Sequence, residues 1–255
     1  MDRIEFIGTY YVGKSTLYKA YSEQIEKSSK YIVEEGVRKV ARKEMGIFTF
    51  YCRSILMRVF QIFGGSLNVY KIPEPFNFQN DILENYKHTL AICFQNENIL
   101  STKYSLIHKT FARLTNLIAR YQFYDSLNLN KTLLTEESII HWHQVLHDLL
   151  LDENFVFSED QLKDKGLFPK ALIYCYADSK LIFERMKMRK NSNQLNVPDM
   201  DQKLDEVLSK LILKQEVLLK YSQIAEENGV GVLRINTDEP IEKNVMKINS
   251  FLQKL

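Results

Sequence analysis

The sequence predicts an α/β fold, a parallel sheet covered by helices on both faces. Its strand candidates are short, continuously apolar runs, and segments of helical character separate them. Strands buried on both faces have this composition. A glycine-containing loop joins the first strand candidate to a helix, as in many parallel folds that bind ligands at the carboxyl edge. The length of 255 residues suits a single domain over 1–255.

The predicted elements alternate along the chain, and each strand is a buried-type run bounded by turn residues. In order they are a strand at Arg3–Ile7, a helix over 13–27, a strand at 31–34, several helices up to Asn128, a strand at Thr132–Thr135, a helix from about Ser138, a strand at Ala171–Tyr176, two helices, a strand at 231–235 and a terminal helix. We expect residues 45–130 to form a helical subdomain over the carboxyl edge of the sheet.

The loop after the first strand carries a phosphate-binding pattern. Residues 8–15 read Gly-Thr-Tyr-Tyr-Val-Gly-Lys-Ser and match G-x-x-x-x-G-K-S/T. Backbone N–H groups and the helix N-terminus would face the phosphates, while Lys14 would reach the β- and γ-oxygens and Ser15 would bind Mg²⁺. The sequence therefore predicts binding of ATP and Mg²⁺ by Gly8, Thr9, Tyr10, Tyr11, Val12, Gly13, Lys14, Ser15 and Thr16.

Two other nucleotide-binding classes lack their signatures here. The chain has no Asn-Lys-x-Asp for reading guanine and no serine-glycine-rich signature helix of transport ATPases. What remains resembles the nucleoside and nucleotide kinases, especially thymidylate-kinase-like proteins and the nicotinamide-riboside kinase type, and also P-loop kinases of bacterial surface-polysaccharide loci. The resemblance implies a P-loop fold and phosphoryl transfer from ATP to a small-molecule acceptor, either a nucleoside or nucleotide or a sugar or glycan.

A carboxylate and an arginine follow the second strand candidate. Glu35 and Arg38 resemble the Glu-x-x-Arg that the nicotinamide-riboside kinase type carries near its acceptor. By this resemblance Glu35 would hydrogen-bond an acceptor hydroxyl or act as general base, and Arg38 would bridge phosphate oxygens. An ordinary ion pair on a helix face explains the same spacing.

The strand at Thr132–Thr135 ends in Glu136 and Glu137. P-loop proteins place the acid that holds the Mg²⁺ water shell here, so we expect Glu136 to serve the metal and Glu137 to be the second choice. The related kinases usually have Asp at this position, which leaves the division of labour between the two glutamates open. A solvated pair that caps the next helix is the alternative. Of the following histidines, His141, His143 and His147, we expect one near the acceptor rather than a zinc site.

A basic helix follows the strand at Ala171–Tyr176. Arg185 and Arg189 are four residues apart and share a helix face. They resemble the lid arginines of thymidylate-type kinases, which close over the ATP phosphates, and residues 185–205 would form the lid. A solvated basic face competes with this interpretation. The segment 233–238 resembles the loop on which these kinases rest the adenine ring.

The two tyrosines of the loop, Tyr10 and Tyr11, occupy positions where many such loops have small residues. Contact with the acceptor and packing over the loop are both open for them. The alternative function is a nucleotide-binding regulatory ATPase that acts on a protein partner, in which one glutamate would orient water.

Charge balance and the distribution of apolar residues limit the kinds of partner that we expect. The 34 basic and 32 acidic residues nearly cancel, so nucleic acid is not expected. The longest apolar stretch, 47–63, is interrupted by Arg53 and Arg58, so we expect no transmembrane segment. Peripheral membrane contact, an acceptor pocket and a homodimer surface remain open for 45–105.

Cysteine usage indicates the compartment. The three cysteines are far apart and form no CxxC pair, which is typical of a reducing, cytoplasmic location. The composition, rich in Lys, Asn and Ile, suits a bacterial origin.

Overall fold

The computed structural model describes the chain in segments, and every structural statement below concerns these residues. They are residues 2–25, 28–45, 113, 117, 121, 124, 127–136, 140–141, 169–190 and 204–255.

In the described residues, five parallel strands form one sheet in the order β2-β3-β1-β4-β5. The strands are β1 (Arg3–Ile7), β2 (Tyr31–Val33), β3 (Thr132–Thr135), β4 (Ala171–Tyr176) and β5 (Gly231–Asn236). The predicted strands are confirmed, with β2 one residue shorter because a helix begins at Glu34, and β5 one residue longer. The parallel sheet expected from the continuously apolar runs is therefore present.

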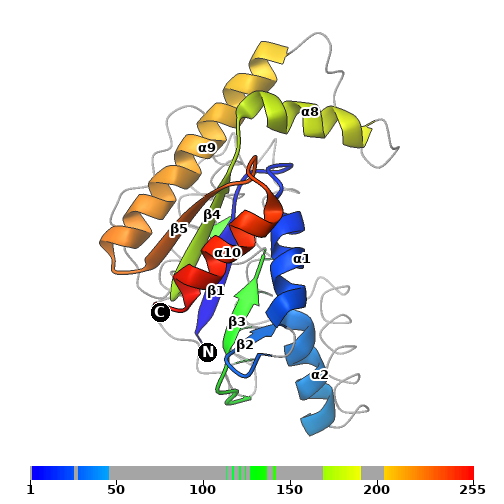
Figure 1. Cartoon of the computed structure of the whole chain (residues 1–255), viewed down its shortest axis with the longest axis vertical. Coiled ribbons are helices and arrows are strands. Elements are labelled where there is room, and N and C mark those ends of the chain that lie inside the picture. The colour runs from blue at the N-terminus through cyan, green and yellow to red at the C-terminus, as the bar shows by residue number, and fades with distance from the viewer. Residues whose placement is uncertain are drawn as a thin grey trace, which may run out of the picture.

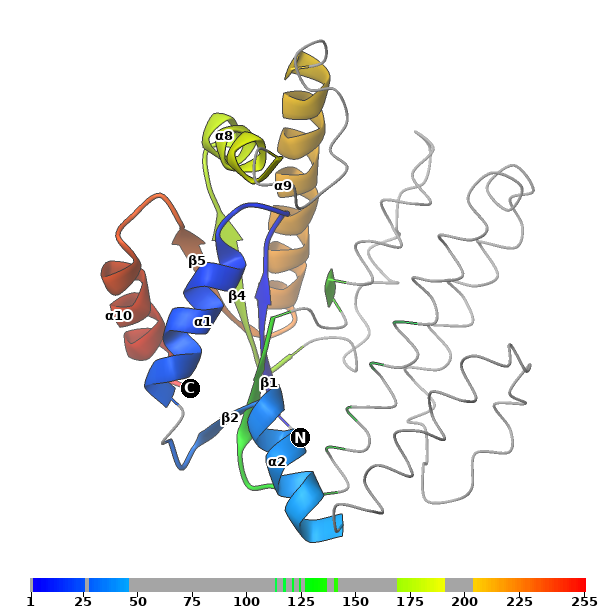
Figure 2. The same ribbon diagram turned by 90° about the vertical axis from the view of Figure 1, so that its right-hand side faces the viewer.

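Helices cover both faces of the sheet. Figures 1 and 2 show α1 (Lys14–Ile25) and α10 (Ile241–Leu252) side by side on one face and α9 (Leu204–Glu227) on the other. α2 (Glu34–Met45) follows β2 directly, and α8 (Ser179–Lys190) lies beyond the carboxyl edge, next to the start of α9. The prediction of a sheet covered on both faces is confirmed.

The core is divided by the pleat of the sheet. Ile4 and Phe6 of β1 point into the cluster beneath α1 and α10, whereas Ile7 points into the cluster beneath α9. Ile173 and Leu172 of β4 divide in the same way. Burying each such side chain contributes about 1.5–3 kcal/mol, so both layers stabilise the strands. This two-sided burial is why apolar residues occupy consecutive positions in strands such as β4.

The strand order brings distant parts of the sequence to one edge. β1 lies between β3 and β4, with Ile4 opposite both Leu134 and Ala171. Because all strands are parallel, the residues that follow them gather at the same edge. These residues are Gly8 after β1, Glu34 after β2, Glu136 after β3, Ala177 after β4 and Thr237 after β5.

Two predicted regions fall largely outside the described residues. Of the helical subdomain expected over 45–130, the structure describes Arg113, Leu117, Tyr121 and Tyr124, all helical, and 127–130. Of the lid expected over 185–205, it describes 185–190 in α8 and the first two residues of α9. In the described part of the chain, no helix is long and apolar enough to cross a membrane.

Candidate functional site

Residues 8–15 turn sharply from β1 into α1, and both glycines have a local reason. A Cβ on Gly8 would lie 2.7 Å from the carbonyl oxygen of Cys175 in β4. Gly13 has a φ of +99°, which L side chains rarely adopt. The amide of Val12 donates to the carbonyl of Thr9 at 3.5 Å. The glycines thus let the loop pack on β4 and then enter the helix.

The two tyrosines of the loop diverge. Tyr11 has a φ of +64°, an uncommon conformation for a residue with a Cβ. It is half-buried and lines a cavity beside α1. Tyr10 is 53% exposed, and its ring lies against that of His141. The two residues therefore serve different sides of the loop.

Lys14 opens α1 and is only 6% exposed, so its side chain stays within the site. His141 lies close enough to be affected by its charge. Burial, with the Lys14 charge as a second cause, lowers the pKa of His141 to about 3. The imidazole is consequently neutral at physiological pH beside a lysine that carries a positive charge.

Ser15 and Glu136 are in direct contact. The Ser15 hydroxyl donates a hydrogen bond to Oε1 of Glu136, across 121 positions of sequence. Glu136 follows the last residue of β3, and Ser15 is the second residue of α1. The structure thus brings together the two residues that the sequence predicts as Mg²⁺ ligands.

A metal bound by this pair would need ligands from elsewhere. Within the described ranges, no three His, Cys, Asp or Glu side chains cluster as a metal site. Mg²⁺ in triphosphate sites takes one or two protein ligands and completes its octahedron with phosphate oxygens and water. The residues present fit Mg²⁺ that arrives with a nucleotide.

The carboxyl end of β2 presents Glu34. The Thr135 hydroxyl donates to Oε1 of Glu34 at 3.1 Å, and the Tyr121 hydroxyl donates to Oγ1 of Thr135 at 3.3 Å. Burial is the main cause that raises the pKa of Tyr18 to about 12, and the charges of Glu34 and Glu136 add to it. Both carboxylates therefore lie near the Tyr18 hydroxyl.

Glu35 does not join this group. Its side chain is 76% exposed and pairs with Lys39 at 3.1 Å on the outer face of α2. α2 begins at Glu34, so successive residues turn by about 100° around the helix axis. Glu34, and not Glu35, therefore contacts the end of β3, and its position directly after the last apolar strand residue is the signal that indicates it.

Arg38 faces Glu34 rather than Glu35. Its Nη2 lies 3.4 Å from Oε2 of Glu34, one helical turn away. Hydrogen bonding to Tyr124 is the main cause that raises the pKa of Arg38. The side chain is 48% exposed. It lies at the rim of the carboxylate group and keeps its charge.

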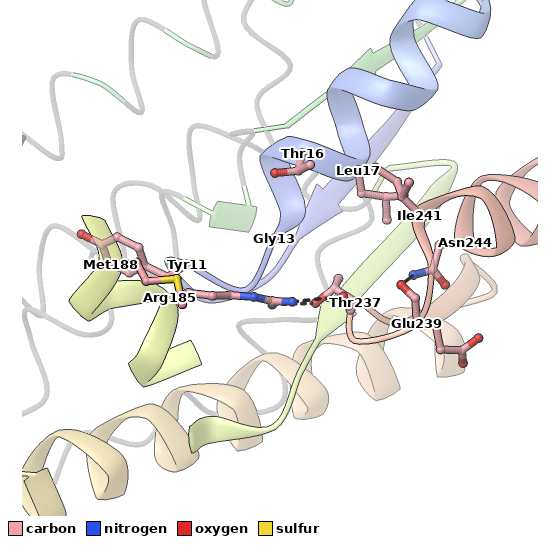
Figure 3. Close-up of a pocket in the computed structure, with 10 residues that line it drawn as sticks. All are labelled: Tyr11, Gly13, Thr16, Leu17, Arg185, Met188, Thr237, Glu239, Ile241 and Asn244. Carbon is pink, nitrogen blue, oxygen red and sulfur yellow. Dashed lines mark hydrogen bonds between the residues drawn. The ribbon is translucent and has the colours of Figure 1, made fainter. Parts of the chain in front are cut away.

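Arg185 reaches from α8 to the loop. Its Nη1 donates to the carbonyl of Val12 at 2.8 Å. The same Nη1 donates to Oγ1 of Thr237 at 3.3 Å, and Nη2 donates to the carbonyl of Thr237 at 3.2 Å (Figure 3). The Thr237 hydroxyl also donates to the carbonyl of Val12. These bonds join α8, the loop and the segment after β5. Glu137, His143, His147 and the side chain of Arg189 lie outside the described residues.

A cavity of about 400 Å³ opens on this side of the loop (Figure 3). Its volume lies in the range of small-molecule sites, and it combines apolar walls with a few polar groups. The Asn244 amide donates to the carbonyls of Asn236 and Glu239, which fixes the loop that forms one wall. The cavity is lined by Tyr11, Gly13, Thr16, Leu17, Arg185, Met188, Thr237, Glu239, Ile241 and Asn244.

The sequence patterns predicted half of this lining and missed the other half. The segment 233–238 was expected to contribute, and Thr237 does so. Met188 and Asn244 carry no pattern of their own and meet the loop only because α8 and α10 converge on it. Only the three-dimensional arrangement reveals them.

Comparison of the chain with protein-family models and with curated proteins found no match. The fold is α/β with five parallel strands in the described residues, and the candidate site is the loop at 8–15 with the two unlike halves of the sheet edge on either side of it. The β4 and β5 half holds the cavity with Arg185 and Thr237. The β2 and β3 half holds the carboxylates of Glu34 and Glu136. A functional assignment has to come from this geometry.

Proposed function

We propose that the protein is a P-loop kinase that transfers the γ-phosphoryl group of Mg-ATP to a small-molecule acceptor. The observation that carries the proposal is the contact between the Ser15 hydroxyl and the Glu136 carboxylate. In P-loop proteins a hydroxyl and a carboxylate at these two places hold the same Mg²⁺ ion. Neither motif by itself requires the other to be adjacent, so their contact is independent support.

The loop would hold the donor phosphates. Its backbone N–H groups and the start of α1 provide positive partial charge, and the buried Lys14 adds a full charge. Mg²⁺ would be held by Ser15 and Glu136 and would neutralise charge on the transferring group. Arg185, already bonded to the loop, would close the donor side together with Arg189. Catalysis would consist mostly of positioning.

The two halves of the sheet edge suit the two substrates. The cavity beside Arg185 and Thr237 would take the nucleoside of ATP. Because attacking and leaving oxygens lie in line through phosphorus, the acceptor must approach from the opposite side. That side carries Glu34, whose carboxylate would orient the acceptor hydroxyl or accept its proton.

An acceptor screen tests the proposal. The purified protein is given Mg-ATP with a panel of nucleosides, nucleotides, sugars and glycans, and ADP release is followed. We expect one class of acceptor to raise turnover, and we expect this activity to disappear in Lys14→Ala. Lys19→Ala, an exposed lysine on the same helix, is the matched control and should keep the activity.

Two other results would contradict a kinase. A flat panel with intact ATP binding would do so. Slow ATP hydrolysis that responds to a protein partner instead of a small molecule would indicate the regulatory ATPase.

A further inference from the structure

Tyr10 and His141 form an aromatic pair on the β3 side of the loop. Their ring centroids are 5.8 Å apart and their planes are inclined by 84°. This edge-to-face geometry is one of the two that aromatic pairs prefer. Tyr10 is 53% exposed, whereas His141 is 3% exposed. A buried ring therefore supports a ring that is open to solvent.

The supporting residue is fixed to the centre of the sheet. The amide of Ile140, directly before His141, donates to Oε2 of Glu5 at 3.4 Å. Glu5 belongs to the central strand β1, is fully buried and pairs with Arg3 at 2.6 Å. The low pKa of His141 also keeps its ring neutral. Tyr10 thus packs against a buried, uncharged ring.

Tyr10 lies on the acceptor side of the loop. Tyr11 lines the cavity next to α8 and α10, while Tyr10 contacts the segment that follows β3 and Glu136. If the nucleoside of ATP fills the cavity, in-line transfer places the acceptor on the side of Tyr10. This step rests on the proposed function.

We infer that Tyr10, supported by His141, is the platform on which a ring of the acceptor stacks. The acceptor would accordingly carry a nucleobase or a pyranose and would not be an acyclic polyol. Stacking on an exposed aromatic ring needs only a flat face, and tyrosine offers such a face at little conformational cost. Stacking of the acceptor would explain why an exposed Tyr stands at a loop position where many such loops have small residues.

Binding in the presence of Mg²⁺ and a non-hydrolysable ATP analogue tests this directly. Saturation-transfer NMR compares thymidine, methyl α-D-glucopyranoside and erythritol on wild type, Tyr10→Phe and Tyr10→Ala. We expect one of the two ring compounds to bind wild type and Tyr10→Phe, with about 10-fold weaker binding to Tyr10→Ala. Thymidine binding would identify a nucleobase as the ring, and glucopyranoside binding a sugar. Met246→Ala, which removes another exposed large side chain, should change nothing.

A variant pair tests the supporting role of His141. His141→Phe keeps an aromatic ring under Tyr10 and should retain binding of the ring compound, whereas His141→Ala should weaken it. Tyr10 is exposed, so its variants are expected to fold even if those of His141 do not. Affinity for the ATP analogue is measured separately by calorimetry, so that every variant is compared at a saturating concentration of the analogue.

Three results would overturn the inference. In the first, erythritol binds as tightly as the ring compounds. In the second, wild type and Tyr10→Ala bind the ring compounds equally. In the third, neither ring compound binds while the ATP analogue still binds. Failure of the wild type to bind the analogue at all would instead refute the proposed function, and the inference would fall with it.

Discussion

Replacing Gly8 with alanine probes how the loop packs on the sheet. The added Cβ would lie 2.7 Å from the carbonyl oxygen of Cys175 and 2.9 Å from Cγ1 of Val12. Real Cβ atoms essentially never approach other atoms within 3.0 Å. The Cys175 carbonyl belongs to β4, which is paired with both β1 and β5, so the obstacle is held by its neighbours.

The cost follows from this overlap. Overpacking a well-packed site typically costs about 1–3 kcal/mol, and a rigid backbone obstacle places Gly8→Ala in the upper part, at about 2–3 kcal/mol. In a domain of this size each kcal/mol lowers Tm by about 2–4 °C, so we expect a decrease of about 4–12 °C. Because the loop itself must shift, the affinity for Mg-ATP should also decrease.

Calorimetry of Gly8→Ala and of Gly229→Ala separates the steric effect from a backbone effect. Gly229 has a φ of +80°, and a Cβ there would meet nothing within 4 Å. Gly229→Ala should therefore cost only the conformational strain, about 1 kcal/mol, and should leave Mg-ATP binding intact. If Gly8→Ala melts no lower than Gly229→Ala and binds Mg-ATP normally, the described packing of the loop on β4 is wrong.

Three further predictions concern the site. Glu136→Gln should weaken ATP binding about 10-fold in Mg²⁺ but not in EDTA, because the amide cannot balance the metal charge; equal losses in titration calorimetry would contradict this. The pKa of His141 is about 3 in the folded chain and ordinarily 6.5, so the unfolded chain takes up the proton first as the pH decreases. Stability should therefore fall below pH 6.5 by up to about 1.4 kcal/mol per pH unit. Urea melts should show that the free energy of unfolding decreases less at acid pH in His141→Phe than in wild type. An equal decrease in both proteins would refute this prediction. Arg185→Lys keeps the charge but cannot bridge the loop and Thr237 together, so calorimetry should show several-fold weaker nucleotide binding. Lys187→Ala, on the same helix, should bind the nucleotide as tightly as wild type.

The local elements were predictable because short-range physics determines them. Strands such as β4 are apolar at every position since both faces are covered, and the two glycines of the loop answer local requirements of contact and φ. The strand order was not predictable in the same way. It depends on pairings such as β1 with β3, whose residues are far apart in sequence.

The contacts of the candidate site also differ in how far the sequence predicts them. Ser15 and Glu136 were predicted as partners of one metal, and the structure places them in contact. The Glu-x-x-Arg spacing to Arg38 favours Glu35 over Glu34, its neighbour by one residue. On a helix one residue corresponds to about 100° of rotation, so this shift exchanges an inward for an outward carboxylate. The pairing of Tyr10 with His141 follows from tertiary packing alone.

If the site built around Ser15 and Glu136 transfers a phosphoryl group, a radiolabelled γ-phosphate can be followed from ATP to the acceptor. The protein is incubated with Mg-ATP labelled in the γ-phosphate and with the acceptor panel, and the products are separated. We expect label in one acceptor with wild type and in none with Lys14→Ala. Label that remains in ATP, or appears only as inorganic phosphate, would contradict it.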